Sequence, residues 1–211
     1  MLEFNVEKIN IPLKQHVGGP CQPIVNVGDH VKRGQLVATP NGLGANIHTS
    51  LSGVVEEVND MEIIVKLDKE QTDDYVRLEQ TDDKLQKIKD AGIVGVGGAG
   101  FPTGIKLSAQ IPGGYVIANA AECEPILGHN VKFMEENPEV LVRGLKYIVE
   151  LTGAKEGYIA IKTKYRKAML ALGKACKNEP NISIKILPNM YPAGDERVIV
   201  RETLGVILKP G

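Results

Sequence analysis

Hydrophobic and polar positions follow two different rhythms along the chain. From about residue 10 to residue 66, short apolar runs are separated by glycine and proline, which is typical of short β-strands joined by turns. After residue 92, apolar strands alternate with longer segments of helical spacing, which indicates a parallel sheet with crossover helices. The pattern therefore predicts a β region followed by a Rossmann-like α/β region.

The individual elements can be located from their periodicity and their end signals. In the α/β region, strands are predicted at 115–119, 158–161 and 182–187, and helices at 138–151, 165–177 and from 195 to about 204. A short helix is predicted at 82–91, because acids precede lysines and Gly92 follows. Residues 67–81 are polar without a sustained period and are interpreted as a linker. The predicted domains are therefore 1–66 and 82–211.

Composition narrows the classes of function. The chain has 211 residues, of which 43% are hydrophobic and 24% charged, and its net charge of −1 gives no support to nucleic-acid binding. No apolar run approaches the ~20 residues needed to span a bilayer, and no signal-peptide core is present. We expect a cytoplasmic protein without membrane insertion, for which peripheral docking to a membrane complex stays open.

Cysteine and histidine spacing gives no sign of a metal site. The residues concerned are Cys21, Cys123, Cys176, His16, His30, His48 and His129. The cysteines are odd in number and form no Cys-x-x-Cys pair, so they predict neither a disulfide framework nor an iron–sulfur cluster within this chain. The histidines lack metal-ligand spacing and are interpreted as surface or hydrogen-bonded residues.

A glycine-rich loop follows the short helix. Its glycines are Gly95, Gly97, Gly98 and Gly100. Because glycine has no Cβ, such a loop can bring backbone N–H groups against a ligand, and successive N–H donors form an anion site, most often for phosphate. Lys106 could add a mobile positive charge. Taken alone, the loop is equally compatible with a plain glycine-rich turn.

Acidic turns follow two of the predicted strands. The first reads Asn119-Ala-Ala-Glu122-Cys-Glu124, and the second contains Gly194-Asp195-Glu196. Open α/β sheets bind ligands at the carboxyl ends of their strands, and these acids could accept hydrogen bonds from ribityl or ribose hydroxyls. The alternatives are solvated loop acids in the first turn and acids that offset a helix dipole in the second.

The β region resembles the barrel-sandwich domains that carry biotin or lipoate. The resemblance lies in Val27-Gly-Asp-x-Val-x-x-Gly-x-Leu-Val, followed by Ser52-Gly-Val-Val. A carrier needs a lysine between these half-motifs, but residues 39–52 contain none, so we expect an unmodified, structural module. The role of the loop Lys14-Gln-His-Val-Gly-Gly-Pro20 stays open, between a functional loop and a turn that packs on the barrel.

Three motifs together carry a family resemblance. Gly95-x-Gly-Gly-Ala-Gly-Phe-Pro-Thr-Gly, Asn119-Ala-Ala-Glu-Cys-Glu-Pro and Tyr191-Pro-Ala-Gly-Asp-Glu resemble the complex I 51 kDa-type FMN-binding fold. The opening Leu13-Lys-Gln-His-Val-Gly-Gly-Pro is similar to that of the RnfC/PrdC family. This family comprises the RnfC component of the Rnf electron-transport complex and a soluble relative, PrdC, associated with proline reductase.

The resemblance implies an electron-transfer flavoprotein module that takes hydride from NADH onto FMN and passes electrons to an iron–sulfur or reductase partner. It implies that the acids Glu122 and Glu124 lie near the flavin and nicotinamide, where they act by positioning. The implied cofactor-binding residues are Gly95, Gly97, Gly98, Ala99, Gly100, Phe101, Lys106, Asn119, Gly194, Asp195 and Glu196.

Departures from the family pattern leave a second hypothesis open. Val96 stands where complex I relatives often have arginine, Ala121 replaces an acid, and the second turn has Asp195 and Arg197 at positions where complex I has glutamate and threonine. The chain also ends at Gly211, about where the family continues into further domains, including one with iron–sulfur clusters. The alternative function is a non-catalytic structural or docking fragment of a larger redox complex.

Overall fold

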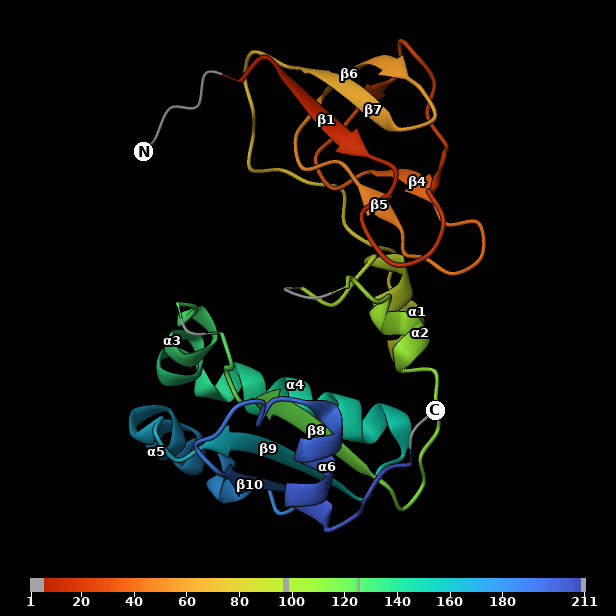
Figure 1. Cartoon of the computed structure of the whole chain (residues 1–211). Helices are drawn as coiled ribbons and strands as arrows, with labels where there is room; N and C mark the ends of the chain where they lie inside the picture. The colour runs from red at the N-terminus through yellow and green to blue at the C-terminus, as the bar shows by residue number, and fades with distance from the viewer. Residues whose placement is uncertain (1–5, 97–98, 125, 210–211) are drawn as a thin grey trace. The chain divides into compact units, whose positions relative to one another are not determined.

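The computed structural model describes residues 6–96, 99–124 and 126–209. Its chain divides into two compact units, of which the first ends at Ala109 and the second begins at Gln110 (Figure 1). The glycine-rich loop therefore belongs to the same compact unit as the β region, whereas both acidic turns belong to the second unit.

The first unit is built on two small antiparallel sheets. The strands are β1 (Lys8–Pro12), β2 (Gln22–Pro23), β3 (His30–Val31), β4 (Leu36–Thr39), β5 (Ile47–His48), β6 (Gly53–Val58) and β7 (Glu62–Leu67). One sheet has the order β1-β7-β6-β3 and the other β2-β4-β5. Alternating residues of both sheets form one core, in which Val31, Val37, Ile63 and Val65 are fully buried. The expected short strands are confirmed.

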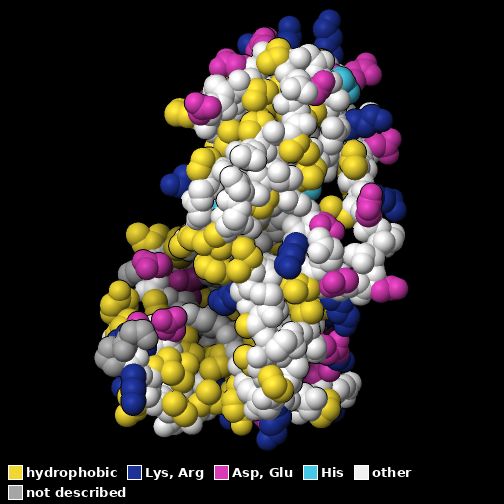
Figure 2. Space-filling model, turned by 90° about the vertical axis from the view of Figure 1, so that its right-hand side faces the viewer, with side chains coloured by type: hydrophobic (Ala, Val, Ile, Leu, Met, Phe, Trp, Pro, Cys, Tyr) yellow, Lys and Arg dark blue, Asp and Glu magenta, His cyan; other side chains and the backbone are white. Residues whose placement is uncertain are grey.

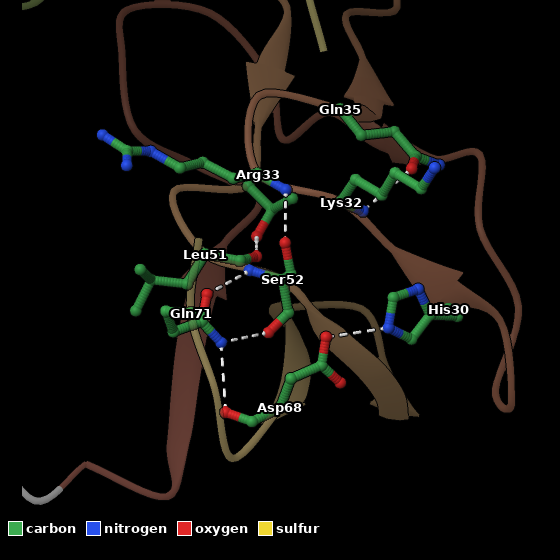
Figure 3. Close-up of polar contacts among 9 residues, drawn as sticks. His30, Lys32, Arg33, Gln35, Leu51, Ser52, Asp68 and Gln71 are labelled. Carbon is green, nitrogen blue, oxygen red and sulfur yellow. Dashed lines mark hydrogen bonds and ion pairs between the residues drawn. The ribbon is translucent and has the colours of Figure 1, made fainter. Parts of the chain in front are cut away.

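The polar segment after β7 contains no described helix or strand, and hydrogen bonds attach it to the barrel. The Gln71 side chain pairs with the Ser52 backbone: Gln71 Oε1 accepts from the Ser52 N–H at 2.9 Å, and Gln71 Nε2 donates to the Ser52 carbonyl at 2.8 Å (Figure 3). Asp68 lies 2.9 Å from His30 Nε2 (Figure 3). Further along, the Val76 N–H donates to the Arg33 carbonyl at 2.8 Å. The segment thus follows the surface of the barrel.

Two short helices complete the first unit, α1 (Lys84–Asp90) and α2 (Thr103–Lys106). The helix predicted at 82–91 is present as α1, and Asp83 caps it by accepting from the backbone N–H groups of Leu85 and Gln86. Asn46 Nδ2 of the barrel donates to the Asp90 carbonyl at 3.3 Å. Gly92 has φ +64° and passes so close to the Asn46 carbonyl that a Cβ atom would lie 2.1 Å from that oxygen. The hairpin in which a carrier would present its lysine is therefore packed against α1.

The second unit is a three-stranded parallel sheet of order β10-β9-β8 (Figure 1). Its elements are β8 (Tyr115–Ala120), α3 (His129–Glu136), α4 (Pro138–Thr152), β9 (Glu156–Lys162), α5 (Arg166–Ala175), the 3₁₀ turn η1 (Cys176–Asn178), β10 (Ile182–Leu187) and α6 (Glu196–Leu204). Helices α3, α4 and α5 pack on one face of the sheet, and α6 packs on the other through Ile199. The predicted strands and helices are confirmed, and α3 is an additional helix.

The surface carries charges of both signs. On the face in Figure 2, basic and acidic side chains are interspersed, in keeping with the net charge of −1. Within the described part of the chain, no helix combines the length and apolar character that crossing a membrane requires.

Candidate functional site

The two acidic turns meet at the carboxyl end of the parallel sheet. Asn119, near the end of β8, joins them: its Nδ2 donates to the Gly194 carbonyl at 3.0 Å, and its Oδ1 accepts from the Ala121 N–H at 3.1 Å. The turns are 75 residues apart in the sequence, yet one side-chain amide fixes both. Parallel strands that end at one edge bring such turns together, as the sequence predicts.

The Glu122 carboxylate folds back onto its own turn. It accepts from the Glu124 N–H at 3.2 Å and from Asn130 Nδ2 at 2.9 Å. Burial raises the pKa of the Glu122 carboxyl, but these hydrogen bonds and the nearby His129 more than offset that effect, so its net pKa lies below the ordinary value. The Glu124 side chain is exposed. The two acids therefore differ: the first carboxylate is held by its turn, and the second faces solvent.

A buried lysine at the end of β9 holds the first acidic turn through hydrogen bonds. Lys162 ends β9, is only 4% exposed, and donates through Nζ to the Glu122 carbonyl at 3.1 Å and to Cys123 Sγ at 3.3 Å. The same sulfur accepts from the Gly194 N–H at 3.2 Å. Sequence reasoning did not assign a role to Lys162. The available signal was a charged residue directly after the buried apolar run 157–161, at the carboxyl end of a strand.

The second turn begins helix α6. Asp195 is the N-cap residue, and its Oδ1 accepts from the N–H groups of Arg197 at 3.0 Å and Val198 at 3.3 Å. Glu196 occupies the first turn of the helix and is exposed. Asp195 thus has a structural role as the N-cap residue of α6.

The glycine-rich loop is closed at its base in the first unit. Val94 and Pro102 form an antiparallel bridge, and the Gly95 N–H donates to the Phe101 carbonyl at 3.0 Å. The N–H of Gly95 is thereby committed within the loop. Val96 is 98% exposed, which places this flank of the loop in solvent. Of the remaining predicted loop residues, Ala99, Phe101 and Lys106 are exposed, while Gly97 and Gly98 lie outside the described residues.

The end of the loop rests on the barrel. Gly100 is buried with φ +67°, its carbonyl accepts from the Val17 N–H at 3.3 Å, and a Cβ atom there would lie 3.1 Å from the Cα atom of His16. His16 is itself buried: its Nδ1 lies 3.0 Å from the Val17 carbonyl, and its Nε2 accepts from the Ala45 N–H at 3.1 Å. The loop 14–20, whose role the sequence left open, is therefore the support on which the glycine-rich loop lies.

Comparison with known protein families assigns both parts of the chain. Residues 4–78 match the family described as RnfC barrel sandwich hybrid domain, and residues 88–211 match the Nuo51 FMN-binding domain. The second match covers more than half of the chain. The chain belongs to the Nuo51 FMN-binding domain family. The predicted fold class and the resemblance to RnfC are confirmed.

Curated relatives agree with this assignment. The chain is 36% identical over 220 residues to the RnfC-type component of the Na(+)-translocating ferredoxin:NAD(+) oxidoreductase complex of Acetobacterium woodii, with 94% of this chain and 49% of that protein covered. It is 43% identical over 129 residues to "Cobalamin reductase PduS" of Salmonella typhimurium, with 61% and 28% covered. A solved NAD+-reducing [NiFe]-hydrogenase gives a TM-score of 0.49 at 27% identity, with 57% of this chain and 23% of that one covered.

The chain spans about half the length of the first of these relatives. Both curated relatives are named as oxidoreductases or reductases, and the RnfC relative is one component of a multi-protein complex. Family membership therefore establishes the two domain types of this chain, an RnfC-type barrel sandwich hybrid domain and a Nuo51-type FMN-binding domain.

Proposed function

We propose that this chain binds FMN and NADH and passes electrons from NADH to an iron–sulfur protein or reductase partner. When bound, FMN supplies the capacity to accept a hydride and to release electrons one at a time. The observation that carries the proposal is the Asn119–Gly194 hydrogen bond, which holds two acidic turns together at the carboxyl end of a parallel sheet in a chain of the Nuo51 FMN-binding domain family.

The residues present fit such a ligand in chemical character. FMN and NADH combine hydroxyl groups, which need acceptors, with phosphates, which need N–H groups or cations. The second unit offers exposed carboxylates at Glu124 and Glu196, beside the capping carboxylate of Asp195. The first unit offers the exposed ammonium of Lys106 and the glycine-rich loop. We assign sugar-like hydroxyls to the carboxylates and phosphate to the loop with Lys106, each as a property of its own unit.

Titration with FMN and riboflavin tests this assignment. Flavin fluorescence and absorbance are followed as each flavin is added to the purified chain, and NADH-dependent reduction of an artificial electron acceptor is then measured. If Lys106 contacts the phosphate, Lys106→Ala should weaken FMN binding about tenfold and leave riboflavin binding unchanged, because a hydrogen bond to a charged group contributes roughly 1.5–3 kcal/mol. The matched control is Lys69→Ala, which removes an exposed lysine of the same unit.

A second candidate is a non-catalytic structural or docking fragment of a larger redox complex, since the RnfC relative is one component of a multi-protein complex. A purified protein that shows no flavin absorbance, does not bind added FMN and gives no NADH-dependent acceptor reduction would establish this candidate and refute the first. Under the first proposal, the partner is either an Rnf-type membrane complex, docked at the cytoplasmic side, or a soluble amino-acid reductase of the PrdC and proline reductase kind. Any iron–sulfur clusters would belong to that partner or to a longer form of the chain.

A further inference from the structure

The most unusual polar group of the second unit is the ammonium of Lys162. Its side chain is almost completely buried at the end of β9, the central strand of the sheet (Figure 1). Its Nζ donates to the Glu122 carbonyl at 3.1 Å, and the Tyr165 hydroxyl donates to the same oxygen, also at 3.1 Å. Two side chains, one from the last residue of β9 and one from the turn after it, thus converge on a single carbonyl of the first acidic turn.

Stability alone does not account for a lysine at this position. Removing an ammonium group from water costs several kcal/mol, and a carboxylate partner is the usual compensation. Among the ion pairs between described residues, none involves Lys162. Even a buried ion pair can often be replaced by apolar side chains of similar volume without loss of stability, so a buried charge is not explained by stability alone. What a lysine adds at position 162, compared with an apolar side chain, is therefore its hydrogen bonds to the first acidic turn.

These bonds also reach the second turn. Lys162 Nζ lies 3.3 Å from Cys123 Sγ, and this sulfur accepts from the Gly194 N–H at 3.2 Å. A Cβ atom on Gly194 would lie 2.9 Å from the same sulfur and 2.9 Å from the Ala121 carbonyl, so the two turns are in tight contact. Fixing the Glu122–Cys123 segment therefore fixes the position of the Gly194 turn as well.

We propose that Lys162 is a positioning residue of the flavin site, which holds both acidic turns in the geometry that receives the ligand. This inference rests on the proposed function for its effect on FMN, whereas its effect on the turns is a property of the ligand-free protein. Lys162 acts through the Glu122 carbonyl and Cys123 Sγ, and Tyr165 assists at the same carbonyl.

Hydrogen exchange in the ligand-free protein tests the first half of the inference. The reporters are the N–H groups of Ala121, Glu124 and Gly194, each of which donates within or between the turns. In Lys162→Met these amides should exchange about tenfold faster, as expected for the loss of hydrogen bonds from a charged donor, while the amides of β10 keep their wild-type rates. Lys167→Met, which removes an exposed lysine of α5, is the matched control and should match the wild type.

FMN titration of the same proteins tests the second half. Lys162→Met should weaken FMN binding about tenfold, and Lys162→Arg, which keeps a charged donor, should recover part of this loss. Tyr165→Phe removes one donor to the carbonyl without changing charge, and it should accelerate the same three amides to a smaller extent. This variant keeps the test decisive if Lys162→Met fails to fold.

The two proposals can fail separately. If wild-type protein binds no FMN, the proposed function fails, and hydrogen exchange still decides whether Lys162 holds the turns. If wild-type protein binds FMN, but Lys162→Met and Tyr165→Phe leave both the three amides and the FMN affinity unchanged, the positioning role is refuted.

Discussion

Replacing Gly194 with alanine would insert a methyl group between the two acidic turns. The new Cβ atom would lie 2.9 Å from the Ala121 carbonyl oxygen and 2.9 Å from Cys123 Sγ. Ordinary van der Waals contact at such positions begins at 3.4 Å, so the turns must separate by about half an ångström. The backbone of Gly194 does not lie in the left-handed region, so the cost is steric rather than conformational.

The magnitude follows from comparison with overpacked cores. Adding a methyl group that forces a backbone shift typically costs about 1–3 kcal/mol, and we expect about 2 kcal/mol here. With a urea m-value of about 1.5 kcal/mol per M for a unit of this size, the unfolding midpoint should fall by roughly 1.3 M. FMN affinity should fall as well, because the Asn119–Gly194 hydrogen bond at 3.0 Å has to lengthen when the turns part.

Tyrosine fluorescence is a suitable assay for the second unit. The chain has no tryptophan and six tyrosines, of which Tyr75 alone lies in the first unit. The control is Gly144→Ala in helix α4, where a Cβ atom would meet nothing within 4 Å. This control should stabilise the unit by about 0.5–1 kcal/mol, since alanine is a better helix former than glycine. Equal urea midpoints for the two variants would refute the tight contact between the turns.

Three further perturbations test other parts of the structure. Asp195→Ala should cost about 1 kcal/mol in the urea assay, whereas Asp195→Asn, which keeps an N-capping oxygen, should cost only a few tenths; equal losses would contradict the cap. Because the folded-state pKa of Glu122 is lowered, its contribution to stability is present above the ordinary carboxyl pKa and is lost as pH falls through the folded value. Asn130→Ala should raise this pKa in a carboxyl NMR titration, and an unchanged value would exclude the 2.9 Å hydrogen bond as a cause. Gly92→Ala should cost about 2 kcal/mol, since φ is +64° and the Cβ would lie 2.1 Å from the Asn46 carbonyl. Its calorimetric transition should fall by about 10 °C, and an unchanged transition would contradict the packing of α1 on the barrel.

Much of the fold could be predicted from the sequence because its signals are local. The strand at 182–187 follows from an apolar run, and helix α4 from its 3.6-residue spacing, with Pro138 at its start and Gly153 in the left-handed conformation at its end. Helix α3 was not predicted. It has no side-chain N-cap bond, and Met134 is its one described buried residue, so its periodicity is weak.

The candidate site depends on contacts between distant residues, which local sequence patterns predict only in part. The acidic turns could be recognised as strand-end motifs, and the parallel topology predicted that they lie at one edge. The sequence could not show that Asn119 bonds to Gly194, that Lys162 is buried beneath Glu122, or that Gly100 lies on His16. Caps and periodicity depend on residues within about four positions, whereas these contacts join residues 40 to 84 positions apart, so only the packing of the folded chain could decide them.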